Sequence, residues 1–156
     1  MLRYTEVCLS GLEVPGEVSI CIYISGCCQR CFNCHYPLLQ SMDYGEKLAD
    51  YYNDIIAIYR SQATCVCFLG EGKNTEKEHQ ELLSMVRYAN EQGLKTCLYS
   101  GRDTDVEPWM CAFDYVKLGS YIEARGALGS ENTNQVMLSR SSDGAFADIT
   151  YKFRLE

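Results

Sequence analysis

The chain has 156 residues, of which 47% are hydrophobic and 22% charged, an ordinary composition for one globular domain. Lysine and arginine number 14 against 21 aspartate and glutamate residues, which gives a formal net charge of −7 without a basic cluster that would suit nucleic acid. No apolar run is long enough to span a bilayer, and the first residues lack a signal-peptide pattern. We therefore expect a single domain over residues 1–156, in the cytoplasm, that binds neither nucleic acid nor membrane.

The first predicted elements are two strands, each followed by a glycine, and a helix between them. Residues 18–25 (VSICIYIS) form an apolar, β-branched run, which predicts a buried strand followed by a loop. Residues 45–60 place apolar side chains at helical spacing, which predicts an amphipathic helix. Residues 65–69 (CVCFL) predict a second strand, and the Gly70-Glu71-Gly72 loop closes it.

The second half of the chain continues this alternation. Thr75 and Glu78 have the spacing of a capping box, so a helix is expected to begin there and to end near Gly93. A short helix is expected within residues 103–110. Apolar runs predict three more strands, at residues 94–100, 115–118 and 147–153, the last as an edge strand.

Strands that alternate with helices predict an α/β fold with a mostly parallel sheet. Ligands of such sheets gather where the strands end, at the carboxyl edge. The loop after residues 18–25 and the glycine loop after residues 65–69 both lie on that edge. We therefore expect the functional site there.

The loop after the first predicted strand carries a cysteine motif. Cys27, Cys31 and Cys34 are spaced C-x3-C-x2-C, so three thiolates can converge on one inorganic cluster. An iron–sulfur cluster held by three cysteines keeps one iron open to a small molecule, which indicates chemistry rather than structure. Structural zinc takes four protein ligands, and Cys28 or His35 as the fourth ligand makes a zinc-binding module the alternative.

The other cysteines are interpreted as core residues. Without an export signal, disulfides are not expected, and cysteine in an apolar strand commonly packs as a small hydrophobe. Cys28 is placed outside the ligand set because neighbouring residues cannot both reach one cluster corner easily. The remaining six are Cys8, Cys21, Cys65, Cys67, Cys97 and Cys111.

The C-x3-C-x2-C motif after an early strand resembles the radical S-adenosylmethionine superfamily. Most of the chain further resembles the activating enzyme of anaerobic (class III) ribonucleotide reductase, a short member of that superfamily with a truncated barrel. The chain is shorter than the about 250 residues that a closed eight-stranded barrel needs. The resemblance therefore implies βα units in a partial, open barrel. It rests on Val14-Pro15-Gly16, Ser25-Gly26-Cys27, Tyr99-Ser100-Gly101, Lys117-Leu118-Gly119-Ser120-Tyr121, Gly129-Ser130 and Asn134-Gln135.

The resemblance implies an oxidoreductase with two cofactors, a [4Fe–4S] cluster on Cys27, Cys31 and Cys34 and S-adenosylmethionine chelated to its open iron. A one-electron donor such as flavodoxin or ferredoxin would reduce the cluster. Reductive cleavage of the cofactor would give a 5′-deoxyadenosyl radical, which abstracts hydrogen from a glycine of the reductase large subunit. An activase for another glycyl-radical enzyme, or a radical enzyme with a small-molecule substrate, is the alternative within this class.

Four residues are implied as contacts of S-adenosylmethionine. Related enzymes usually carry Gly-Gly-Glu after the second strand, where it receives the methionine ammonium, and this chain has Gly70-Glu71-Gly72 instead. Gly70 and Glu71 are carried over to that role. Asn33 stands where the superfamily often has an aromatic residue or glycine, and His35 directly follows the third cysteine. Both are candidate contacts of the same cofactor.

Overall fold

The computed structural model describes residues 1–25 and 45–154 of the chain. Two α-helices lie in this part, α1 (Leu48–Tyr59) and α2 (Glu76–Glu91). Three short 3-10 helices accompany them, η2 (Arg60–Gln62), η3 (Pro108–Ala112) and η4 (Thr150–Arg154). No helix in these residues is long and apolar enough to cross a membrane.

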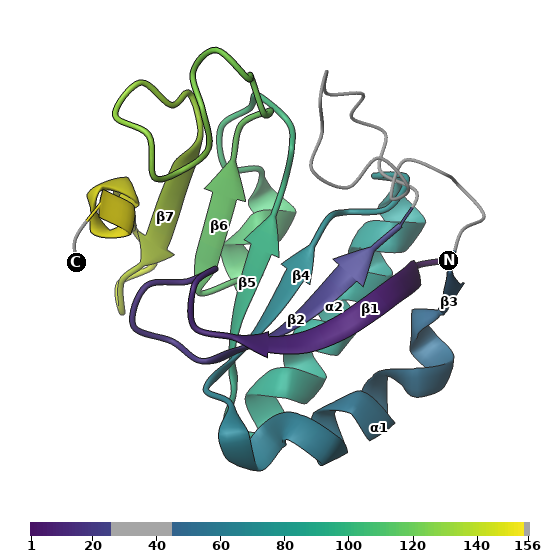
Figure 1. The fold of residues 1–156 in the computed structure, drawn as a ribbon. Coiled ribbons are helices and arrows are strands. Elements are labelled where there is room, and N and C mark those ends of the chain that lie inside the picture. The colour runs from purple at the N-terminus through teal and green to yellow at the C-terminus, as the bar shows by residue number, and fades with distance from the viewer. Residues whose placement is uncertain (26–44, 155–156) are drawn as a thin grey trace.

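The strands in the described residues pair into one eight-stranded sheet. They are β1 (Arg3–Ser10), β2 (Ser19–Ile24), β3 (Glu46–Lys47), β4 (Cys65–Leu69), β5 (Lys95–Tyr99), β6 (Tyr115–Leu118), β7 (Val136–Arg140) and β8 (Phe146–Asp148). Their order across the sheet is β3-β1-β2-β4-β5-β6-β7-β8 (Figure 1). The centre, β2-β4-β5-β6, is parallel, and every pair outside it is antiparallel.

The prediction of an α/β fold with a parallel sheet is confirmed for the centre, whereas the sheet as a whole is mixed and open. The predicted strands 65–69 and 115–118 coincide with β4 and β6. The antiparallel strands β1, β3 and β7 were not expected. Residues 147–153, expected as an edge strand, divide between β8 and η4. A partial barrel is not evident in the described residues, where helical content is low.

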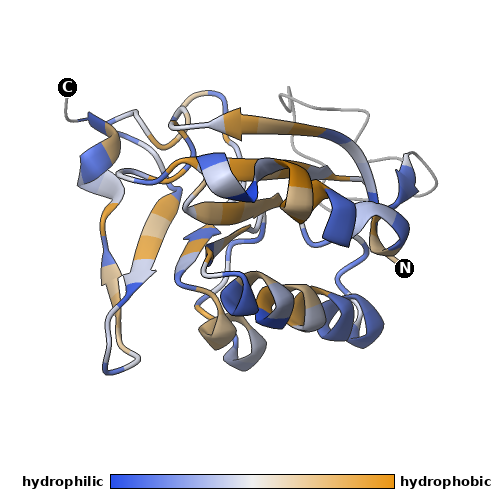
Figure 2. Ribbon diagram, turned by 90° about the horizontal axis from the view of Figure 1, so that it is seen from below, coloured by the Kyte–Doolittle hydropathy of each residue, from blue (hydrophilic) through white to orange (hydrophobic). Residues whose placement is uncertain are grey.

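The main core lies between the sheet and its helices. Figure 2 shows hydrophobic central strands and, below them, helical segments in which hydrophilic and hydrophobic residues alternate. Side chains of β2, β4, β5 and β6 alternate toward α1, α2 and η3, as in Ile22, Phe68 and Leu98, which are fully buried. The opposite face is also covered, because Val14, Leu128 and other apolar side chains pack on it.

Buried cysteines fill this opposite face. Cys21, Cys67 and Cys97 are in register across β2, β4 and β5, and each is fully buried. Burial raises the pKa of the Cys67 and Cys97 thiols, so both stay protonated near neutral pH. Core packing is thus confirmed for these residues. Cys111 is an exception because its side chain is exposed.

Thr75 caps α2, as the sequence predicts. Its hydroxyl oxygen accepts a hydrogen bond from the Glu78 backbone N–H at 3.3 Å, and its hydroxyl donates to the Glu78 carboxylate at 2.8 Å. We expect Thr75→Ala to lower the free energy of unfolding by about 1 kcal/mol in urea denaturation, because a helix N–H loses its partner. Thr75→Ser retains the hydroxyl and is the control. Equal losses in both variants would contradict the cap.

Candidate cofactor site at the carboxyl edge

Four parallel strands, β2, β4, β5 and β6, end at one edge of the sheet, and the Gly70-Glu71-Gly72 loop follows β4 there. Gly70 leaves β4 with a φ of +125°, a conformation that favours glycine. A Cβ at this position would lie 3.2 Å from the backbone oxygen of Ile24, at the end of β2. The glycine is therefore needed for packing of β4 against β2. A larger residue at Gly70 would strain the fold and would not report on cofactor binding alone.

Five predicted site residues lie outside the described part of the chain, namely Cys27, Cys31, Asn33, Cys34 and His35. Ser25, the last described residue before them, is buried and follows the carboxyl end of β2. Its backbone N–H donates to the Arg3 carbonyl at 2.9 Å, which ties Ser25 to β1. Within residues 1–25 and 45–154, no group of three or more His, Cys, Asp or Glu side chains could hold a metal ion.

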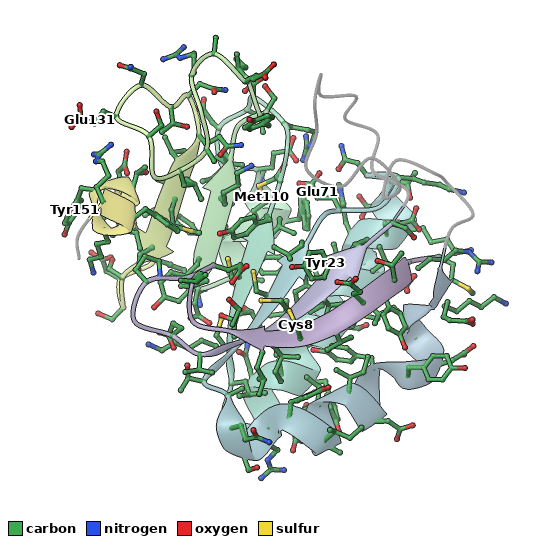
Figure 3. All side chains as sticks on the ribbon, in the orientation of Figure 1. Cys8, Tyr23, Glu71, Met110, Glu131 and Tyr151 are labelled. Atoms are coloured by element: carbon green, nitrogen blue, oxygen red, sulfur yellow. The ribbon has the colours of Figure 1, made fainter. Side chains whose placement is uncertain are left out.

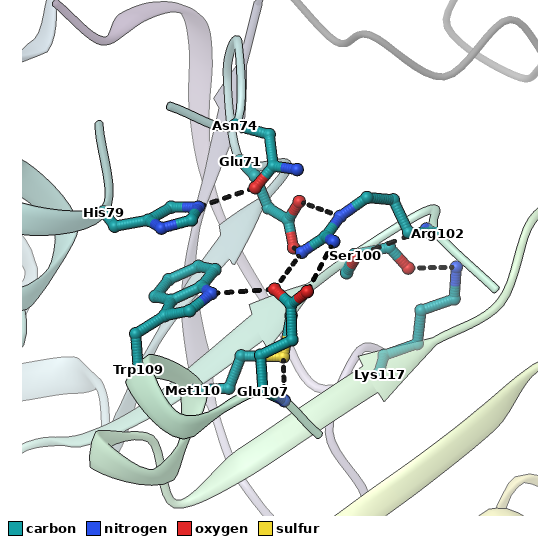
Figure 4. A network of polar contacts seen from close by, with 9 residues as sticks. All are labelled: Glu71, Asn74, His79, Ser100, Arg102, Glu107, Trp109, Met110 and Lys117. Atoms are coloured by element: carbon teal, nitrogen blue, oxygen red, sulfur yellow. Dashed lines mark hydrogen bonds and ion pairs between the residues drawn. The ribbon is translucent and has the colours of Figure 1, made fainter. Parts of the chain in front are cut away.

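Glu71 lies at the edge directly after Gly70, and its carboxylate is engaged. The residue is only 6% exposed. Arg102, which follows β5, donates from Nε to Glu71 Oε2 at 2.9 Å and from Nη2 to Glu71 Oε1 at 3.2 Å (Figure 4). Figure 3 shows the place of Glu71 within the whole molecule, above the end of β4. The structure thus puts a buried carboxylate at the predicted edge, in an ion pair that the sequence did not reveal.

Arg102 also holds a second carboxylate. It donates from Nη2 to Glu107 Oε1 at 2.6 Å and from Nη1 to Glu107 Oε2 at 3.0 Å. The hydrogen bonds from Arg102, and next the one from Trp109, lower the pKa of Glu107 to about 2. Glu107 and Glu71 in turn raise the pKa of Arg102. Two carboxylates around one guanidinium leave this cluster with a net charge of −1, which attracts a cation.

Aromatic and amide groups brace the cluster on its outer side. Trp109 Nε1 donates to Glu107 Oε1 at 2.9 Å, and its ring stacks on His79 with centroids 3.9 Å apart. His79 Nε2 in turn lies 2.6 Å from Asn74 Oδ1. Asn74 has a φ of 58° and belongs to the loop that begins at Gly70. The loop after β4, the first turn of α2 and η3 are therefore tied together around Glu71 (Figure 4).

Lys117 brings a buried ammonium group to the same edge from β6. It is 7% exposed, and Nζ donates to the carbonyl oxygens of Gly119 at 2.8 Å and Ser100 at 3.3 Å. The ammonium lies 5.7 Å from the ring centroid of Tyr99. These contacts join the ends of β5 and β6.

One cavity at the end of β6 is lined by residues of three segments, among them Asp103, Gly119 and Asn134. Asp103 accepts hydrogen bonds from the Ser120 backbone N–H at 2.9 Å and hydroxyl at 2.8 Å, and Asn134 Nδ2 lies 3.4 Å from the same carboxylate. The cavity, of about 350 Å³, opens beside them, with Leu118 and Val136 among its apolar walls. Segments far apart in the sequence thus meet at the end of β6, next to the Arg102 cluster.

Sequence reasoning missed Arg102, Glu107 and Trp109 as site residues. One signal could have found the arginine, because Arg102 follows the predicted strand 94–100 and so must lie on the same edge as Glu71. Its partner Glu107 carries no comparable signal. No family model and no curated protein matches the chain.

Proposed function

We propose that this protein is a radical S-adenosylmethionine activase that places a radical on a glycine of the anaerobic ribonucleotide reductase large subunit. The observation that carries the proposal is the C-x3-C-x2-C motif of Cys27, Cys31 and Cys34, which begins three residues after the end of β2. In this proposal the three thiolates hold a [4Fe–4S] cluster. When reduced and bound to S-adenosylmethionine, the cluster supplies the electron that cleaves the sulfonium.

The carboxyl edge fits the cationic end of S-adenosylmethionine. Glu71 presents a carboxylate there, and the cluster it forms with Arg102 and Glu107 keeps a net negative charge. A buried anion attracts an ammonium more strongly than an exposed one because less water screens the interaction. In the proposal Glu71 therefore receives the methionine ammonium, and Gly70 keeps β4 close to the end of β2. Asn33 and His35 remain candidate contacts of the same cofactor.

The open sheet supports the partner that we propose. The parallel strands β2, β4, β5 and β6 form the βα part of a partial barrel in this proposal, and their carboxyl edge would admit the glycine loop of the reductase. In this proposal the protein works in the cytoplasm, where its cysteines stay reduced. A flavodoxin or a ferredoxin is the proposed electron donor.

The test combines cofactor cleavage with electron paramagnetic resonance. Anaerobically reconstituted protein is mixed with a reductant, S-adenosylmethionine and the ribonucleotide reductase of the same organism. We expect a glycyl doublet in the large subunit and 5′-deoxyadenosine in parallel.

Other outcomes separate the alternatives. Cleavage without a doublet would refute the proposed partner and favour another glycyl-radical enzyme or a small-molecule substrate. Stoichiometric zinc, with no charge-transfer absorption after anaerobic handling, would refute the radical chemistry and favour a zinc-binding module.

A further inference from the structure

The Arg102 guanidinium is fixed on both of its sides. Its outer side meets Glu107, which also accepts from Trp109 and whose backbone N–H lies 3.4 Å from the Met110 sulfur. Its inner side meets both oxygens of Glu71. A planar guanidinium that forks toward two carboxylates has little rotational freedom. The contacts of Glu107 and Trp109 therefore fix the position of the Arg102 side chain, and Arg102 in turn fixes the orientation of the Glu71 carboxylate.

Glu71 depends on this arrangement because it is buried. A carboxylate shielded from water is unfavourable as an ion unless a cation and hydrogen-bond donors compensate it. Arg102 supplies both. Without the guanidinium, the Glu71 side chain would lose the donors that hold it and would turn toward water, so it would stop presenting its carboxylate at the edge.

The ion pair still leaves Glu71 able to bind a ligand. Each of its oxygens accepts one hydrogen bond from Arg102, whereas an ionised carboxylate has about four acceptor positions. The second carboxylate, Glu107, balances the guanidinium charge, so the Glu71 charge is not cancelled. A cationic donor such as an alkylammonium can therefore share Glu71 with Arg102.

We propose that Arg102 is a positioning residue for cofactor recognition, which holds the Glu71 carboxylate in the orientation that receives the ammonium group of S-adenosylmethionine. This inference rests on the proposed function. It assigns a role to a residue outside the sequence motif. Recognition of the amino group then depends on successive contacts from Trp109 to Glu107, from Glu107 to Arg102 and from Arg102 to Glu71.

Calorimetric titration of cluster-loaded protein with three ligands tests this role. S-Adenosylmethionine and its decarboxylated form both carry an ammonium group, whereas 5′-methylthioadenosine lacks it. We expect Arg102→Gln to weaken binding of the first two about tenfold and to leave the third unchanged. Arg102→Lys should restore part of the affinity. Arg87→Gln, which removes an exposed arginine of α2, is the matched control and should change none of the three.

The interpretation can fail in distinguishable ways. If Arg102→Gln weakens the binding of all three ligands equally, or changes none, the positioning role is refuted. Binding of S-adenosylmethionine to the wild-type protein would still support the proposed function in that case. Wild-type protein that binds none of them would refute both. If Arg102→Gln does not fold, Glu107→Gln removes only the brace and should show the same selective loss. In a double-mutant cycle, Glu71→Gln and Arg102→Gln should not be additive if Arg102 acts through Glu71.

Discussion

Alanine at any one of Cys27, Cys31 or Cys34 should abolish the iron–sulfur cluster and with it all cleavage of S-adenosylmethionine. Wild-type protein reconstituted without oxygen should hold about four irons and four sulfides per chain. A cluster with one open iron already uses only three protein thiolates, so the loss of one leaves two irons without protein ligands. Iron and sulfide analysis, together with the charge-transfer absorption, measures the effect.

Two other cysteines provide matched controls. Cys28→Ala changes the residue beside the first predicted ligand, and Cys67→Ala removes a buried thiol of β4. Both variants should keep their iron, although Cys67→Ala should be less stable because it leaves a small cavity. Loss of iron in Cys28→Ala would place this residue among the ligands, and full iron content in a Cys31→Ala variant would refute the motif as the cluster site.

The sequence predicts the central strands well because their signal is local. Residues 65–69 and 115–118 are short apolar runs with clear boundaries, and they become β4 and β6 with the expected ends. In contrast, β1 is only partly buried, and β3 has two residues. Their strand character comes from pairing with each other and with β2, which no local pattern contains.

In the candidate site, too, local features could be predicted from the sequence, whereas contacts between distant residues could not. The rule that ligands gather at the carboxyl edge of parallel strands places Glu71 correctly at that edge. Its ion pair with Arg102 joins residues 31 positions apart, and the direction of two side chains decides whether they meet. Sequence spacing carries no such information. The pairing of one arginine with two carboxylates was therefore visible only in the structure.

The second large effect, a loss of stability, is expected from Phe68, which packs near the carboxyl end of β4. Phe68 is fully buried in β4, two residues before Gly70. Its ring lies 6.0 Å from that of Tyr52 on α1 and 6.2 Å from that of Phe113 after η3, measured between centroids. Phe68→Ala would leave a cavity between the sheet and both segments. We expect the free energy of unfolding to fall by about 3–5 kcal/mol.

Urea denaturation with and without S-adenosylmethionine measures this loss and its consequence. Leu12→Ala, at a position 81% exposed, is the control and should change stability by less than about 0.5 kcal/mol. Since the cavity lies beside β4, the loop that carries Glu71 and the helix η3 that carries Trp109 lose a shared support. S-Adenosylmethionine should still raise the stability of the variant, because its binding favours the folded state. A Phe68→Ala variant as stable as Leu12→Ala would show that α1 and η3 do not depend on this ring for their packing against the sheet.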